Sequence, residues 1–195
     1  MNDEQNQRKG RSSLRLKGYN YSRDGFYFIT ICTHSRWMFF GKILDGKMHL
    51  SQMGLLARKI WKMIENQCDR TRVDEWVIMP DHIHGIIEIG DGQKGFLKNI
   101  PGQFCRSAIN RASTKLEGLH VGGVTGIRNP MLHPGSVSNM VRWFKGRTTH
   151  DIREKFPLED FSWQPKFHDR IIRSQQELHN VRQYIENNPK NWREI

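Results

Sequence analysis

The sequence has few cysteines and no long apolar run. Its three cysteines, Cys32, Cys68 and Cys105, are widely spaced in 195 residues and form no Cys-x-x-Cys pair, which argues against a disulfide framework and against a cysteine zinc cluster. No segment approaches the roughly 18 continuous apolar residues that a membrane span needs. The polar N-terminus lacks the apolar segment of a secretory signal. We therefore expect a soluble, cytoplasmic protein with no membrane partner.

Acidic residues are also scarce. Lysine and arginine number 31 against 20 aspartates and glutamates, so the formal charge is +11. Such an excess predicts a polyanionic partner, and nucleic acid is the natural one. The 6 Trp, 10 Phe and 4 Tyr residues include rings that could stack on unpaired bases, although most of them should belong to the core. The alternative is a protein that is basic for no functional reason.

The length fits one domain with a sizeable core, and we expect that domain over residues 19–195. Residues 1–18 are polar and basic without periodicity, which is typical of a flexible arm. The segment near 90–136 is rich in glycine and predicts an insertion or a mobile segment. The sequence does not show whether the arm becomes ordered on a phosphate backbone, nor what the inserted segment does.

The first part of the chain predicts strands followed by a helix. Residues 27–33 are rich in aromatic and β-branched side chains, as strands are. Residues 39–50, broken at Asp45-Gly46, predict a hairpin. Ser51 is a suitable N-cap for a helix whose apolar residues then follow the helical period.

Two histidines lie in the next β-type run, residues 73–89. Pro80 predicts a bend or an edge just before them, because proline cannot donate to a strand ladder. Successive side chains of a strand point to opposite faces, so His82 and His84 share one face and could both reach one cation. Glu88 lies on the same face and could orient an imidazole, although an ordinary surface carboxylate is the simpler interpretation.

The second part predicts two helices and a β segment between them. Ser136 precedes an amphipathic helix, and residues 161–173 predict a strand pair or one bent strand. Ser174 and Glu177 form the S-x-x-E pattern of a capping box, which begins the last helix. That helix should end just before Pro189.

Tyr184 and Asn188 are spaced i and i+4 on the last helix, so they share a helix face. A phenol can attack phosphorus, and two imidazoles with an amide can hold a metal, so these residues and the histidine pair together suggest DNA cleavage by covalent catalysis. Neither pair is specific alone, since His-x-His is common in a chain with nine histidines and a helical tyrosine usually belongs to the core.

In combination the motifs resemble a known family. Residues 78–87, IMPDHIHGII, resemble the HUH segment of single-tyrosine transposases, in which U is hydrophobic. Residues 184–192, YIENNPKNW, resemble the Y-I-x-x-N-P-x-x-W signature of their branch associated with repetitive extragenic palindromes (REPs). The stretches 141–146 and 163–173 also look like that branch. The resemblance thus extends from about Tyr19 to Trp192, except for the inserted segment.

The resemblance implies an α+β, ferredoxin-like fold: an antiparallel sheet that carries the HUH motif on a central strand, with helices packed on one face. It implies that His82, His84 and Asn188 bind Mg²⁺ or Mn²⁺. Many relatives outside the REP branch have glutamine at the last position, and asparagine is shorter, so it must approach the metal closely or act through water.

The implied function is that of a metal-dependent single-strand DNA endonuclease and strand transferase, a transposase-like enzyme acting on DNA hairpins or REPs in the bacterial nucleoid. Tyr184 would form a 5′-phosphotyrosine intermediate, and the sequence does not name the base that takes its proton. The alternative is a non-catalytic binder of DNA hairpins. A monomer is favoured over a homodimer, because the REP branch is expected to act as a monomer.

Basic residues in two segments are candidates for DNA contact. An ordinary solvated surface is the alternative for each segment. The candidates lie in the N-terminal arm and on the helix after Ser136, and they are Arg8, Lys9, Arg11, Arg15, Arg142, Lys145 and Arg147.

Overall fold

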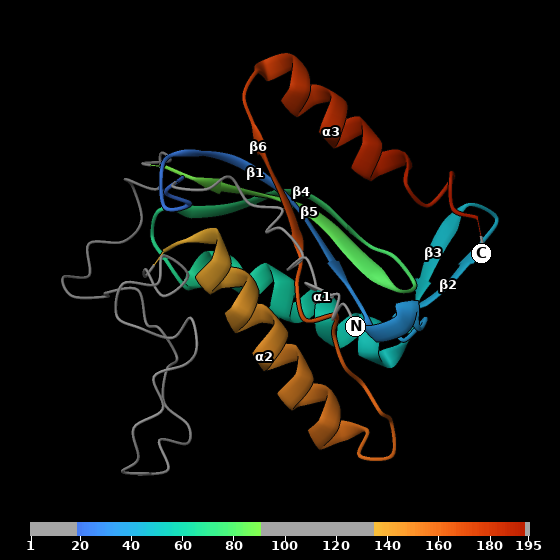
Figure 1. Ribbon diagram of the computed structural model, residues 1–195. Coiled ribbons are helices and arrows are strands. Elements are labelled where there is room, and N and C mark those ends of the chain that lie inside the picture. The colour runs from blue at the N-terminus through green and yellow to red at the C-terminus, as the bar shows by residue number, and fades with distance from the viewer. Residues whose placement is uncertain (1–18, 91–134, 194–195) are drawn as a thin grey trace, which may run out of the picture.

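The computed structural model describes residues 19–90 and 135–193, which are coloured in Figure 1. The predicted arm, residues 1–18, and nearly all of the predicted insertion, residues 90–136, lie outside the described residues. Within the two described ranges, no helix has the length and apolar character needed to cross a membrane.

A four-stranded antiparallel sheet forms the centre of the fold. Its strand order is β4-β5-β1-β6, so β5 and β1 are the central strands. Strand β1 pairs with β5 on one side and with β6 on the other, both antiparallel. The strands are β1 (Gly25–Cys32), β4 (Thr71–Ile78), β5 (His82–Ile89) and β6 (His168–Ile172). The predicted run 73–89 is therefore a hairpin, with Pro80 in the tight connection between β4 and β5.

The two faces of the sheet differ because side chains alternate along β5. Ile83, Ile87 and Ile89 belong to the main core, which also includes residues of α1 (Gln52–Lys62) and α2 (Val137–Lys155). Both helices lie below the sheet in Figure 1.

The opposite face of the sheet carries a second, smaller apolar cluster. Ile86 and Ile172 from the sheet pack there against Leu178 and Ile185 of α3 (Gln175–Asn187). Figure 1 shows α3 above the sheet, across from α1 and α2. The predicted α+β fold class is confirmed. The prediction of helices on one face only is wrong: α1 and α2 pack on one face of the sheet, and α3 covers the other, which carries the histidines, because Ile86 and Ile172 give that face an apolar cluster of its own.

Local signals begin and end these helices as predicted. The hydroxyls of Ser51, Ser136 and Ser174 each accept a hydrogen bond from a backbone N–H in the first turn of α1, α2 and α3. Glu177 completes the cap of α3 by accepting from the backbone N–H of Arg173. The helix α3 ends at Asn187, before Pro189, as expected, although Asn188 keeps helical backbone angles of φ −57° and ψ −43°.

The turn signals also hold in the predicted hairpin, β2 (Gly41–Leu44) and β3 (Lys47–Leu50). Asp45 and Gly46 both have positive φ, at 50° and 67°, as a two-residue hairpin turn requires. The β prediction for residues 161–173 holds only in part.

Within that segment only β6 is a strand, and Trp163 forms one isolated bridge with Thr33. Pro165, between the bridge and β6, has no N–H with which to continue a ladder.

Two glycines give a matched test of the packing. A Cβ at Gly85 would lie 2.3 Å from Cζ2 of the buried Trp61, whereas a Cβ at Gly146 on α2 would meet no atom within 4 Å. We expect Gly85→Ala to destabilise the fold by about 1–3 kcal/mol through overpacking. Gly146→Ala should instead stabilise it by about 0.4–1 kcal/mol, because alanine restricts the unfolded chain. Urea unfolding midpoints measure both changes, and equal shifts would contradict the packing.

Candidate active site

Strand β5 and helix α3 bring two histidines and a tyrosine together. Nε2 of His82 lies 3.0 Å from Nε2 of His84, and the hydroxyl of Tyr184 lies 3.2 Å from the same His84 nitrogen. The histidines are almost fully buried, but Tyr184 is 51% exposed. Three polar atoms from segments 100 residues apart in the chain therefore face one point that is open to solvent.

Each imidazole is held through its other nitrogen. Nδ1 of His82 lies 2.5 Å from a carboxylate oxygen of Asp81, so this nitrogen donates its proton and Nε2 keeps a free lone pair. Nδ1 of His84 lies 2.8 Å from the hydroxyl of Thr30, its direct partner on β1. Carboxylate and hydroxyl partners of this kind fix the ring orientation of histidines that bind metals.

Burial, together with the smaller effects of the nearby His82 and Arg36, lowers the pKa of His84 to about 3. His84 is therefore neutral at physiological pH. The two Nε2 atoms are 3.0 Å apart, close enough to share a proton or to bind one cation between them.

The spacing suits a metal. Histidine nitrogens bind metals at about 2.0–2.1 Å, and two ligands at roughly right angles around such an ion are separated by about 3 Å, as the two Nε2 atoms are. Asn188 is the C-cap of α3, one turn beyond Tyr184, and is half-buried. Its side chain has no hydrogen-bond partner among the described residues and makes no hydrogen bond to either histidine.

Aromatic rings surround the three polar atoms. Phe28 stacks on His84 at 5.3 Å between ring centroids and meets Tyr184 edge-on at 6.0 Å. Trp192 packs against His82 at 5.8 Å. A cavity of about 570 Å³ extends along α3 from this point, lined by Phe28, Tyr184, Arg170 and the polar side chains of the first turns of the helix.

The basic residues predicted to contact DNA are not gathered at this point. Arg142, Lys145 and Arg147 lie on α2, which covers the other face of the sheet. Arg147 pairs with Asp151 at 2.9 Å. The ammonium group of Lys145 donates to the backbone carbonyl of Gln164, and burial lowers its pKa.

Only Arg142 of these three is exposed without a described partner, so a role of α2 in DNA binding stays a prediction. Arg8, Lys9, Arg11 and Arg15 lie outside the described residues.

Sequence reasoning did not find the partners of the histidines. Glu88, the carboxylate considered for that role, lies 3.7 Å from Arg72 instead. Asp81 directly precedes His82, and this adjacency was the available signal. Thr30 and Phe28 gave no signal, because their positions depend on the pairing of β1 with β5.

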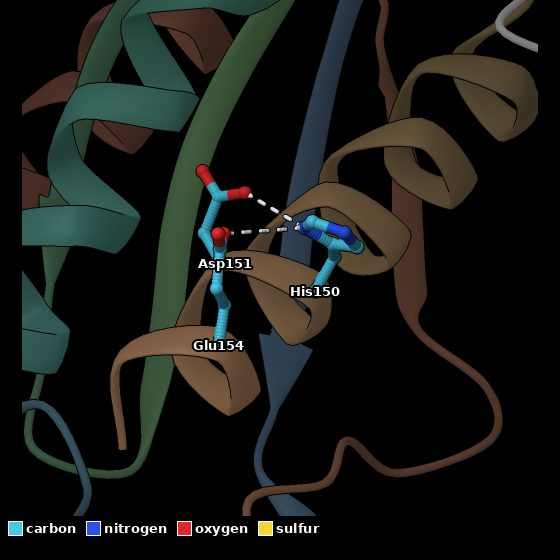
Figure 2. Close-up of side chains that lie close together, drawn as sticks. All are labelled: His150, Asp151 and Glu154. Carbon is cyan, nitrogen blue, oxygen red and sulfur yellow. Dashed lines mark hydrogen bonds and ion pairs between the residues drawn. The ribbon is translucent and has the colours of Figure 1, made fainter. Parts of the chain in front are cut away.

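A second group of potential ligands lies on α2. Figure 2 shows His150, Asp151 and Glu154 close together on that helix. The side chains of His150 and Glu154 are each 70% exposed, and Asp151 already pairs with Arg147. These are ordinary solvated i,i+4 contacts, and none of the three residues is near Tyr184.

Comparison with known proteins identifies a family and a similar fold. The family described as "Transposase IS200 like" matches residues 131–188. An uncharacterized protein of Haemophilus influenzae is 34% identical over 182 residues, which cover 93% of this chain and 89% of the relative.

Two solved structures are similar. One is a REP-associated tyrosine transposase bound to a REP hairpin, with a TM-score of 0.52, 18% identity and coverage of 90% of this chain and 72% of that one. The other is a transposase from Deinococcus radiodurans, with a TM-score of 0.43, 14% identity and coverage of 89% and 97%.

The first of these structures shares the overall fold with this chain, an antiparallel sheet with helices, and the matching family supplies the class of protein, a transposase. The chain belongs to the IS200-like transposase family.

The depressed pKa of His84 predicts how stability depends on pH. The unfolded chain binds a proton at His84 below about pH 6.5, whereas the folded chain binds it only near pH 3. Above pH 6.5 the neutral His84 therefore makes its full contribution to the free energy of unfolding. As the pH falls toward 3, this contribution decreases by no more than about 1.4 kcal/mol per pH unit.

We expect the metal-free variant His84→Gln to lose less unfolding free energy than the wild type between pH 6.5 and 4, as measured by urea titration in EDTA. Parallel curves would show that His84 titrates normally in the folded protein.

Proposed function

We propose that this transposase is a metal-dependent single-strand DNA endonuclease and strand transferase that acts through Tyr184. The observation that carries the proposal is the convergence of the Tyr184 hydroxyl with Nε2 of His84 at 3.2 Å, and of that nitrogen with Nε2 of His82 at 3.0 Å. An exposed phenol next to two oriented imidazoles supplies a nucleophile and a metal-binding pair at one point.

In the proposed reaction the Tyr184 oxygen forms a bond to the scissile phosphorus, and the bond from phosphorus to the 3′ oxygen breaks. The products are a 5′-phosphotyrosine and a free 3′-hydroxyl. The phosphodiester energy is kept in the new ester, so a second DNA 3′-hydroxyl can reverse the step and join different strands. This exchange is the chemistry of DNA transposition and recombination.

His82, His84 and Asn188 are the proposed ligands of Mg²⁺ or Mn²⁺. The bound cation would neutralise charge on a non-bridging oxygen of the scissile phosphate. Two imidazole ligands favour Mn²⁺ over Mg²⁺ because nitrogen is the softer ligand, although cellular abundance can reverse that preference. Asp81 and Thr30 orient the rings, and Phe28 and Trp192 pack against them.

Hairpin or single-stranded DNA is the proposed substrate. The cavity beside Tyr184 is lined by Phe28 and by polar side chains of α3, which suits unpaired bases better than a duplex. A REP hairpin is bound by the REP-associated transposase whose fold is similar. Together with the YIENNPKNW motif, this supports assignment to the REP-associated branch.

Tyr184 lies next to the histidines of its own chain, so the proposed site needs no tyrosine from a partner subunit. This arrangement supports a monomer.

A covalent adduct tests the proposal directly. We expect labelled hairpin DNA with an unpaired flank, incubated with the protein and Mn²⁺, to give a species that resists SDS. Tyr184→Phe should abolish the adduct, because it removes only the attacking oxygen, and EDTA should do the same. Tyr19→Phe is the matched control, since its hydroxyl contacts only Tyr27 among the described residues, and it should form adduct within about twofold of the wild type.

Binding of the same DNA, measured by fluorescence anisotropy, separates the two functional candidates. DNA that is bound but never linked, across hairpins and REP sequences, would favour the non-catalytic hairpin binder. An adduct that survives in Tyr184→Phe would exclude Tyr184 as the nucleophile.

Two adjacent asparagines test the ligand set. Asn188→Ala should weaken Mn²⁺ binding at least about tenfold if its amide is a ligand. Asn187→Ala should leave it unchanged, because that side chain donates to the backbone carbonyl of Gln183 on its own helix. Isothermal titration with Mn²⁺ measures both, with His82→Ala as the reference for loss of a ligand. Equal affinities for Asn188→Ala and the wild type would remove Asn188 from the set.

A further inference from the structure

The turn that follows β1 has an unfavourable backbone conformation. Ser35 and Arg36 both have left-handed φ values, 50° and 60°. Side chains other than glycine rarely adopt this region, which costs of order 1 kcal/mol for each residue, and such residues tend to cluster at functional sites. Contacts around the turn must therefore hold it in place.

Those contacts join the turn to the β4–β5 connection. The backbone N–H of Thr33 donates to the carbonyl oxygen of Asp81 at 2.9 Å, and the Thr33 hydroxyl lies 2.8 Å from the carbonyl oxygen of Trp37 and 2.9 Å from that of Asp81. The backbone N–H of Phe40 donates to the carbonyl of Pro80 at 3.0 Å. The segment that carries Arg36 and the residue before His82 thus form one connected unit.

The side chains of this unit form a chain of charged hydrogen bonds. Nε of Arg36 lies 2.6 Å from Oδ2 of Asp81, and Oδ1 of the same carboxylate lies 2.5 Å from Nδ1 of His82. The Asp81 side chain is only 5% exposed. Each carboxylate oxygen therefore has one partner, and the plane of the carboxylate is fixed from both sides.

We propose that Arg36 is a positioning residue that holds Asp81 so that Nε2 of His82 faces the metal site. The proposal rests on the function proposed above, because it gives His82 the role of a ligand. Without Arg36 the buried carboxylate would keep His82 as its only side-chain partner and could turn about its last torsion. The Nδ1–H tautomer and the ring angle of His82 would then no longer be uniquely determined.

An arginine suits this role better than a lysine. While Nε of Arg36 binds Asp81, its Nη1 donates to the sulfur of Cys32 at 3.0 Å. The rigid guanidinium fork thereby bridges the end of β1 and the residue before β5, whereas an ammonium group offers one point of contact on a flexible stem.

Metal affinity without DNA tests the proposal. Arg36→Met should weaken Mn²⁺ binding by about 10–100-fold, the usual effect of losing a group that orients a metal ligand. Arg36→Lys should recover part of that loss. Arg72→Met is the matched control, because Arg72 also faces a carboxylate on β5, at 3.7 Å, but Glu88 does not contact the histidines; it should bind Mn²⁺ like the wild type.

The tautomer of His82 provides a readout that requires neither metal nor activity. Nitrogen-15 NMR of the metal-free protein near pH 8 should show His82 protonated at Nδ1 in the wild type and in Arg72→Met, and a mixture of tautomers in Arg36→Met. In an Asp81→Asn background, Arg36→Met should have little further effect on Mn²⁺ affinity, because the carboxylate through which it acts is gone.

Wild-type affinity and an unchanged tautomer in Arg36→Met would overturn the proposal. The proposal would also be overturned if Arg36→Met weakened Mn²⁺ binding by the same factor in the wild-type and in the Asp81→Asn background. A failure of the proposed function can be distinguished from a failure of this proposal. If the wild type forms no DNA adduct, the proposed function fails, but the tautomer of His82 can still be measured. If the tautomer preference is then lost only in Arg36→Met, Arg36 is still the positioning residue. Urea midpoints of the variants check that the fold is retained.

Discussion

The site depends on a central strand that is covered on both faces. In β5 the isoleucines at odd positions pack into the core with α1 and α2, and this packing fixes which side of the strand faces α3. A shift of one residue in register would exchange the two faces, burying the histidines in the main apolar core and moving the odd-numbered isoleucines to the face under α3. The burial of these isoleucines against α1 and α2 therefore keeps His82 and His84 on the opposite face of the sheet, where they meet Tyr184 of α3.

The upper layer is thinner, and this suits a site that must admit DNA. The α3 helix is anchored by a small cluster that includes Ile86 and Ile185, while Tyr184, next in sequence to Ile185, stays half exposed. An ion pair between Arg182 and Asp74, with N–O distances of 2.8 and 3.1 Å, ties the same helix to β4. The tyrosine thus lies on a helix that is attached to the sheet, and its side chain is half exposed.

Much of the fold could be predicted because its signals are local. The signals are the serine caps, the Asp45-Gly46 turn and the proline after α3. Each acts on the backbone within a few residues, so the structure has the features that the sequence predicts. The segment 161–173 was harder, because its pairing with β1 is decided by strands from elsewhere in the chain. The position of α3 over the histidine face had no local signal either, since an amphipathic helix does not specify which apolar surface it covers.

The sequence alone determined the elements of chemistry: two histidines on one face of a strand, and a tyrosine with an asparagine one helical turn beyond it. Alternation and helical period impose those relations within each element. Only the tertiary structure decided that the two elements meet, that Thr30 contacts His84, and that Arg36 contacts Asp81. Such contacts join residues up to 100 positions apart, and they arise from strand pairing and the packing of two apolar faces, which no short window of sequence contains.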